Sequence, residues 1–324
     1  MTKYLVFEEF YRFMKKLFLI AVLLMLAASF TSVSAQKKKS KDDLFKEIAT
    51  LSNTKVPEDS EKAYQLSKEF LSRFGMDKDE RVPKIRTYYN NYRQQSFYNA
   101  VEGKKYSDAF LIGKEILAEQ PENTEVLMNL AFAGYNAFIG TRDKTFNDDS
   151  AAFAKKTLQL FEAGKLPAAF APFKDQEEAI AFMNYVAGAL GFEKDMKDAV
   201  TYIYQSTLHE SVIKNSSESV YLIATYYEAL YETVSTDMKA KVAAKTISDA
   251  AVNTEMEKVG KILDLMMDAY ARAFKRGEAE KNPSAVQWKQ RLAQVYKFRK
   301  NTDAGLTEYI NYITTTALPA PAKF

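Results

Sequence analysis

Apolar residues recur at helical spacing along almost the whole chain. Between residues 218 and 231, one helical face carries Val220, Ile223, Ala224, Tyr227 and Leu230. Between residues 286 and 298, the same pattern falls on Trp288, Leu292, Ala293 and Tyr296. Apolar side chains three and four positions apart line one side of an amphipathic helix. Prolines stand mostly at segment ends, and the alternation typical of strands is scarce. The pattern therefore predicts an all-α chain.

The predicted helices also repeat one another. Four of them carry an aliphatic residue, then an alanine, and three or four residues later a tyrosine or leucine. These sets are Leu130-Ala131-Tyr135, Val186-Ala187-Leu190, Ile223-Ala224-Tyr227 and Leu292-Ala293-Tyr296. Several are followed by a second helix with a small residue at matching depth, at Ala154, Ala199 and Gly305. Small residues allow two antiparallel helices to approach closely, so the pattern predicts packed pairs of helices.

One stretch makes the repeat specific. In residues 102–126, Tyr106, Ala109 and Pro121 follow an inter-helix turn at Gly103, and Asn123 can cap the next helix. These residues and their spacings resemble the second helix of the tetratricopeptide repeat. The resemblance covers 90–123, 124–167, 180–215, 217–283 and 285–317. It implies an α-solenoid of stacked antiparallel hairpins. An irregular helical bundle with alanine-rich packing is the alternative.

The repeats depart from the family pattern in places, and they set the expected domain boundaries. Gly113 stands where the family usually has a large aromatic residue, and an extra helix is expected around residues 237–258. We expect the helical repeat domain to span residues 59–317. The remaining segments would be an N-terminal extension with a signal sequence (1–35), a basic tail and linker (36–58) and a C-terminal tail (318–324).

The N-terminal residues have the pattern of a secretory signal. Met14 and two lysines precede an apolar run at 17–30, and Val33 and Ala35 are small residues at the positions read by signal peptidase. The run is shorter than the roughly 20 residues of a membrane-spanning helix. We therefore expect translation to start at Met14 and the signal to be cleaved, a retained anchor being the alternative. The predicted location is the periplasm or exterior of a Gram-negative bacterium, without stable membrane insertion after cleavage.

Composition narrows the class further. The chain has no cysteine, which excludes disulfides, thiolate metal sites and attachment of lipid at a cysteine after the signal. Its formal net charge is only +3, with both signs interspersed, so nucleic acid is not an expected partner. The basic run at 37–41 is interpreted as a solvated tail, with contact to lipid headgroups as the alternative.

Candidate chemistry is sparse. The single histidine, His209, has no HExxH motif or spaced carboxylates around it, so no metal site is predicted. Its position late in a predicted helix suits an interaction with the helix dipole. The sequence contains neither a nucleophile elbow nor a phosphate-binding loop. We predict no cofactor and no catalytic residue, although a carboxylate pair assembled by the fold stays open.

A stacked array of hairpins turns its first helices toward a concave surface. Helical phase then predicts a groove of amides and aromatic rings. Its residues would be Asn91, Gln95, Tyr98, Asn129, Phe132, Asn136, Asn184, Tyr185, Tyr221, Thr225, Gln290, Arg291 and Gln294. Clamping of a terminal carboxylate is not expected, because Gln94 and Tyr98 occupy positions where family members that do so carry Lys and Asn.

Such a groove suits hydrogen bonding to a peptide backbone or stacking on a sugar ring. The sequence therefore predicts a non-enzymatic scaffold or assembly factor that binds a protein or peptide partner. Two other classes stay open: a carbohydrate-binding component of an outer-membrane uptake system, and a helical-bundle enzyme with a carboxylate site.

Overall fold

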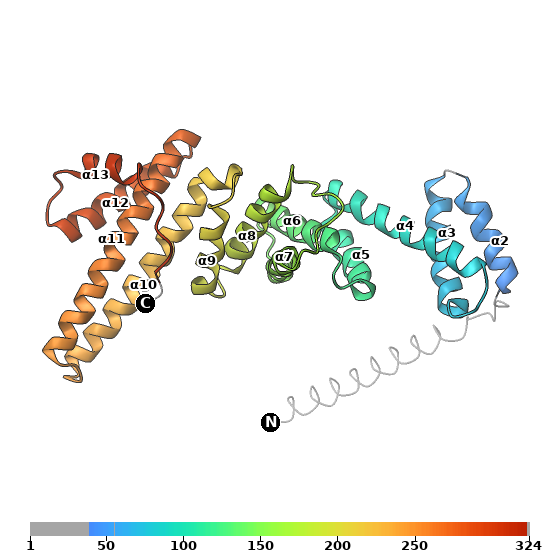
Figure 1. The fold of residues 1–324 in the computed structure, drawn as a ribbon, viewed down its shortest axis with the longest axis horizontal. Coiled ribbons are helices and arrows are strands. Elements are labelled where there is room, and N and C mark those ends of the chain that lie inside the picture. Colours follow the sequence, from blue (N-terminus) through green and yellow to red (C-terminus); the bar gives the residue numbers. More distant parts are fainter. Residues whose placement is uncertain (1–38, 55, 323–324) are drawn as a thin grey trace, which may run out of the picture. The chain divides into compact units, whose positions relative to one another are not determined.

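The computed structural model describes residues 39–322 apart from residue 55, and within these residues the chain is all-helical. Figure 1 shows the order of the helices. The chain divides into two compact units, Met1–Tyr92 and Arg93–Phe324. The predicted extension and signal sequence at 1–35 lie outside the described residues.

The first unit contains α2 (Lys41–Ser52), α3 (Pro57–Phe74) and the beginning of α4 (Arg81–Glu102). Its core is formed by Leu44, Ile48, Phe70, Val82 and Ile85, all of them buried. The segment 36–58, expected to be a tail and linker, thus contains the packed helix α2. Leu44 and Ile48 stand four residues apart and form the buried side of α2, a periodicity masked in the sequence by the adjacent lysines.

The second unit contains the rest of α4 and the helices that follow, most of which are joined by short loops. These are α5 (Tyr106–Glu119), α6 (Thr124–Thr141), α7 (Asn147–Glu162), α8 (Gln176–Gly191), α9 (Met196–Ser206), the 3-10 helix η1 (Val212–Asn215), α10 (Ser217–Ala243), α11 (Asp249–Glu280), α12 (Ala285–Lys300) and α13 (Leu306–Ile313). From α5 to α12, each α-helix packs against the next α-helix along the chain, and α6 also contacts α8.

Helix ends follow the sequence signals closely at several loops. The Asn123 side chain accepts a hydrogen bond from the backbone N–H of Val126, so the predicted cap of α6 is confirmed. Pro121 lies in the short turn between α5 and α6, as predicted. The separate helix expected around 237–258 is not formed, because α10 continues to Ala243 and α11 begins at Asp249.

Small residues bring α8 and α9 together. Ala187 and Ala199 are both buried, in accordance with the predicted close approach. A Cβ atom added at Gly188 would stand 2.8 Å from the carbonyl oxygen of Ala199 and 2.9 Å from the backbone nitrogen of Ile203. Gly305 plays a different part from the one expected. It lies before α13 with φ of +86°, a conformation that glycine adopts without strain.

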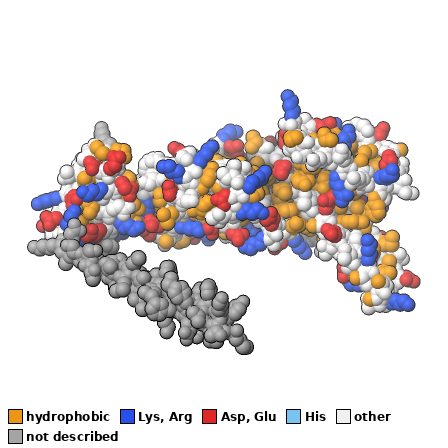
Figure 2. Space-filling model, turned by 180° about the vertical axis from the view of Figure 1, so that it is seen from behind, with side chains coloured by type: hydrophobic (Ala, Val, Ile, Leu, Met, Phe, Trp, Pro, Cys, Tyr) orange, Lys and Arg blue, Asp and Glu red, His pale blue; other side chains and the backbone are white. Residues whose placement is uncertain are grey.

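The surface mixes charge with apolar side chains. On the face shown in Figure 2, Lys and Arg alternate with Asp and Glu, and hydrophobic side chains are visible between them. Large hydrophobic residues with substantial exposure include Leu111 on α5, Val286 and Phe298 on α12, and Tyr312 on α13. The described surface thus has apolar contact areas, and its charges of both signs are mixed rather than gathered in a patch of one sign.

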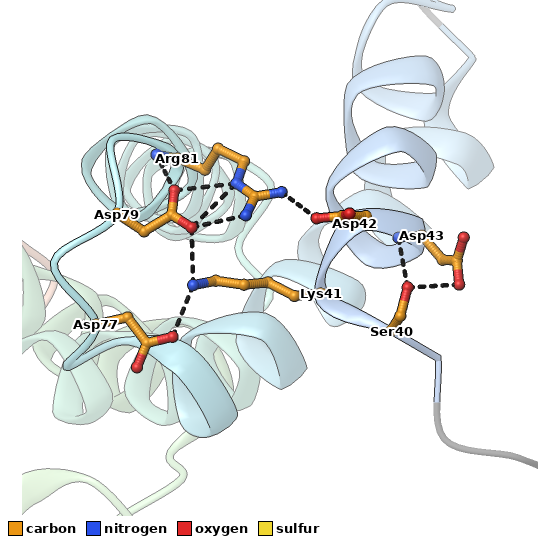
Figure 3. Close-up of polar contacts among 7 residues, drawn as sticks. All are labelled: Ser40, Lys41, Asp42, Asp43, Asp77, Asp79 and Arg81. Atoms are coloured by element: carbon orange, nitrogen blue, oxygen red, sulfur yellow. Dashed lines mark hydrogen bonds and ion pairs between the residues drawn. The ribbon is translucent and has the colours of Figure 1, made fainter.

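Charged side chains join the start of α2 to the loop that precedes α4 (Figure 3). Lys41 Nζ lies 2.6 Å from Asp77 Oδ2 and 2.8 Å from Asp79 Oδ2. Arg81 donates from Nε and Nη2 to the Asp79 carboxylate and pairs through Nη1 with Asp42. Hydrogen bonds from Arg81 and Lys41 hold the pKa of Asp79 far below its ordinary value. This network secures the first turn of α2.

Replacement of Asp79 by asparagine is expected to loosen α2 at neutral pH. The folded-state pKa of Asp79 is lowered, so its stabilisation is present above the unfolded pKa of about 4 and is lost as the pH falls toward the folded value. Hydrogen exchange of α2 amides should therefore accelerate in Asp79→Asn at pH 7, and the difference from wild type should shrink on acidification. Glu80→Gln, at an exposed neighbouring position, serves as the control. Equal exchange in all three proteins at pH 7 would contradict this role.

Candidate functional site

The residues predicted to line a groove are distributed over both units. Asn91 is exposed on α4 in the first unit. The others belong to the second unit, where the structure places them in two groups. The first group is on α4, α6 and α8 and contains Gln95, Tyr98, Asn129, Phe132, Asn136, Asn184 and Tyr185. The second is on α10 and α12 and contains Tyr221, Thr225, Gln290, Arg291 and Gln294.

A row of aromatic rings connects α6 with α8. The Phe182 ring centroid lies 5.7 Å from that of Phe132 and 5.3 Å from that of Tyr135. Tyr135 in turn meets Tyr185 edge-on at 5.6 Å. Phe173, from the loop before α8, contacts Phe132 and Phe182 at 5.8 and 5.0 Å. Contacts of this geometry are favourable between aromatic side chains. We call these five residues the aromatic row.

Only part of the aromatic row was identified from the sequence. Phe132 and Tyr185 were predicted for the groove, Tyr135 was assigned to helix packing, and Phe182 and Phe173 were missed. A signal for Phe182 was present, because α6 and α8 carry the same AF-x-x-Y order, at 131–135 and 181–185. In that order the Phe and Tyr lie three residues apart, and therefore on one side of each helix. All members except Tyr185 keep part of their surface exposed.

A hollow of about 740 Å³ adjoins the aromatic row on α6. Its walls include Asn129, Phe132 and Asn136, three of the predicted residues. The remaining walls come from the end of α4 and Lys104 after it, from Tyr106 at the start of α5, from the end of α6 at 139–141 and from the loop at 171–172. The hollow therefore offers an aromatic ring next to amide and hydroxyl groups.

Two of the predicted amides are used within the fold. Asn129 is 5% exposed, and its Nδ2 donates to the backbone oxygens of Glu125 and, at 3.3 Å, Ala171. Asn184 is 6% exposed and donates to the backbone oxygen of Ile180. Asn129 thereby helps to hold the loop beside the hollow. Asn136 is the more accessible amide of this wall.

Tyrosine hydroxyls around the aromatic row are neutral donors. Burial raises the pKa of Tyr185 well above its ordinary value, and burial also raises that of Tyr135. The two hydroxyls interact with each other. Tyr98 on α4 behaves similarly, since burial and a hydrogen bond with Glu125 raise its pKa. The site consequently presents rings, hydroxyls and amides, with Glu102 and Lys104 as the charged residues at the wall of the hollow.

Asn184 faces a second hollow, also of about 740 Å³, between α7, α8 and α9. Lys155 lies at one wall of it, where its Nζ stands 4.9 Å from the Tyr202 ring centroid and also pairs with Asp198. His209 lies at another wall, three residues beyond the end of α9, with Nδ1 at 2.9 Å from Glu177 Oε2. The partner of His209 is thus a carboxylate from α8 and not the helix end that the sequence suggested.

The second group of predicted residues is largely engaged with neighbouring side chains. Tyr221 stacks on Trp288 with ring centroids 5.0 Å apart. Arg291 pairs with Glu228 of α10 and donates to Gln294. Arg291 and Gln294 also border a small, mostly apolar hollow of about 250 Å³ beside Phe298. This group is separate from the hollow on α6.

The described residues contain neither a cluster of metal-binding side chains nor a helix that could span a membrane. Among residues 39–322 without 55, no three His, Asp or Glu side chains are grouped as a metal site requires. Across the same residues, no helix combines the length and apolar character needed to span a bilayer.

Comparison with models of protein families, with curated proteins and with solved structures gave no match to this chain.

Proposed function

We propose that this chain is an exported, non-enzymatic helical-repeat protein that binds a protein partner through the aromatic row and the adjoining hollow on α6. The observation that carries the proposal is the AF-x-x-Y order on both α6 and α8, whose rings meet in one continuous row. Export is supported by the signal-like sequence at 14–35. The bound segment would be an extended peptide or loop, read by rings and amides.

A tetratricopeptide-like arrangement is supported by the order of the helices. The packed pairs α6–α7, α8–α9 and α10–α11 begin near residues 124, 180 and 217, where repeats were expected to start, and α12 begins at the last expected start, residue 285, although α13 packs against α11. The contact between α6 and α8 is the one that successive first helices would make in a stack of hairpins. In such a stack the aromatic row lies on the side formed by first helices, which is the usual binding side.

Aromatic side chains are suitable anchors for a protein partner. Exposed Phe and Tyr side chains give large contact areas at small cost in conformational entropy, and interface hot spots are rich in aromatic residues. Phe132 and Phe182 are the members of the row that combine partial exposure with a neighbouring cavity or loop. Truncation of one such anchor commonly costs more than about 1 kcal/mol of binding free energy.

Phe132→Ala and Phe182→Ala should each weaken capture of a specific partner from envelope extract, by about 10-fold or more in affinity once the partner is purified. Leu111→Ala is the matched control, because Leu111 is a large apolar residue on α5 that is 65% exposed. Each variant would first be checked for a native helical circular dichroism signal. Capture of the same proteins, at the same affinity, by all four chains would overturn the proposal.

Carbohydrate binding is the second candidate, and the hollow on α6 gives it a specific basis. A partly exposed ring, Phe132, stands beside the amide of Asn136 and close to Tyr106, a combination that suits a sugar ring. A glycan array discriminates between the candidates. Saturable binding of one glycan class that is lost in Phe132→Ala would favour the sugar, and an array without signal would favour the protein partner.

A further inference from the structure

The chain after α13 forms a segment that turns at residues 314–316 and then runs back, without helix or strand, along α10 and α11 (Figure 1). Residues 314–322, with the sequence TTTALPAPA, make up this segment, which we call the C-terminal tail. Contacts with side chains of α11 hold its beginning, and contacts with side chains of α10 hold its end. The tail surface is distinct from the aromatic row on α6 and α8.

Arg272 of α11 holds the beginning of the tail. Its Nη1 donates to the backbone oxygen of Thr316 at 2.7 Å, and its Nη2 donates to Thr316 Oγ1 at 2.8 Å and to the backbone oxygen of Ala317 at 3.0 Å. The guanidinium is buried and is oriented by Asp268, which accepts from Nε at 2.6 Å. A buried, fixed fork of donors is therefore aimed at the turn that ends α13 and at the residue that follows it.

Two tyrosines of α10 hold the other end. The Tyr226 hydroxyl donates to the backbone oxygen of Ala322, and the Ala322 N–H donates to the Tyr227 hydroxyl at 3.3 Å. Both tyrosines are buried, and burial raises the pKa of Tyr227 to about 12, so its hydroxyl stays protonated. Between the two ends, Leu318 packs against the apolar core of α10 to α13.

Most of these contacts are made with backbone groups of the tail and few with its side chains. Apart from the Thr316 hydroxyl and the Leu318 side chain, each tail group named above is a backbone N–H or C=O. Pro319 and Pro321 have no N–H to satisfy, and their fixed φ favours an extended chain. Without the tail, Arg272 would lose three acceptors in a buried position, which is unfavourable unless another segment supplies them. Beyond the turn, the geometry at residues 317–322 suits a segment with a leucine before alternating prolines.

The surface of α10 and α11 that the C-terminal tail covers, between Arg272 and the pair Tyr226 and Tyr227, is called the tail groove. We propose that the tail groove is a binding site for extended, proline-containing peptide segments, and that the C-terminal tail is its resident occupant. A partner segment must displace the tail to bind. Because the tail is covalently attached, its effective concentration at the groove is on the order of millimolar or above, so the closed form prevails unless the partner segment is held nearby or the tail is removed. The site does not depend on partner binding at the aromatic row.

The test uses a fluorescently labelled peptide of the tail sequence, residues 314–322, added to three forms of the chain. In Leu318→Asp of the full chain, a charge replaces the apolar anchor of the tail, which frees the groove while leaving its walls intact. We expect this variant to bind the peptide at least 10-fold more tightly than the wild-type chain. A chain that ends at Ile313 should behave like Leu318→Asp. A peptide with Asp in place of Leu318 is the matched control and should bind none of the forms.

Binding of the unmodified peptide with equal affinity to wild type and Leu318→Asp would overturn the proposal, as would no binding to Leu318→Asp with a native helical signal. If the chain ending at Ile313 does not fold, the full-length variant still decides the question. Phe132→Ala in the Leu318→Asp background should leave peptide affinity unchanged, which separates this groove from the aromatic row.

Discussion

Replacing Arg272 by methionine is expected to lower the free energy of unfolding of the second unit by about 3–5 kcal/mol at pH 7. The reason is the carboxylate of Asp268, which lies on the same buried side of α11 and is paired with Arg272 at 2.6 Å. Removing the guanidinium leaves a buried charge without its counter-ion. Urea denaturation followed by circular dichroism measures the loss.

The double variant Arg272→Met, Asp268→Leu is the control for this interpretation. It removes both charges together, and a buried ion pair replaced by apolar side chains of similar size often costs little. We therefore expect it to recover the part of the lost stability that comes from the unpaired Asp268 charge, while the hydrogen bonds from Arg272 to Thr316 and Ala317 are missing in both variants. A single variant destabilised by less than about 1 kcal/mol would contradict the role of the pair. A double variant as unstable as the single one would do the same.

Acid should rescue the single variant in part. Burial raises the pKa of Asp268 even in the wild-type chain, against the opposite effect of Arg272. Without Arg272 that pKa should rise further. A carboxyl group with a raised folded pKa favours folding at low pH, and this contribution is lost as the pH rises toward the folded value. The stability gap between Arg272→Met and wild type should thus be smaller at pH 5 than at pH 7.

The second large effect is expected at the contact between α8 and α9. Gly188→Leu adds a side chain where even a Cβ atom would stand 2.8 Å from the carbonyl oxygen of Ala199. That neighbour is backbone and cannot rotate away, so the two helices must separate. We expect a loss of about 3 kcal/mol or more, in spite of the better helix propensity of leucine, measured by urea or thermal unfolding.

Gly191→Leu is the matched control in the same helix. A Cβ atom at Gly191 meets no other atom within 4 Å, so only helix propensity changes. The expected effect is between neutral and a gain of about 0.8 kcal/mol. Equal destabilisation by leucine at both positions would show that the close approach of α8 and α9 is not the reason why position 188 requires a glycine.

Helix periodicity was sufficient to predict the all-α class and several element boundaries. Tyr227 and Tyr296 were predicted as packing residues, and both are buried. The cap at Asn123 was also predictable from the sequence, because an N-cap depends only on residues within one helical turn. The long hairpin of α10 and α11 was harder to predict. Its turn at 244–248 depends on a positive φ at Lys245 and a cap at Ser248, neither of which has a strong sequence signal.

The candidate site could be predicted only in part, because helical phase gives the side of a helix and not what packs on that side. Asn129 and Asn184 have the phase expected of groove residues, yet both are buried. Each donates to the carbonyl four residues earlier in its own helix, which allows a polar side chain to be buried at small cost. Phe182 was missed because the repeat of the AF-x-x-Y order on α6 and α8 was not used.

The AF-x-x-Y order has an evolutionary consequence. Two helices carry the same ring pair in the same order, and the rings of these pairs meet at tilted or edge-to-face angles. A row of rings built in this way can be lengthened or shortened by duplication or deletion of the gene segment that encodes one helical unit. Under the proposed function, such a change alters the length of the bound segment and leaves the chemistry of each ring contact the same.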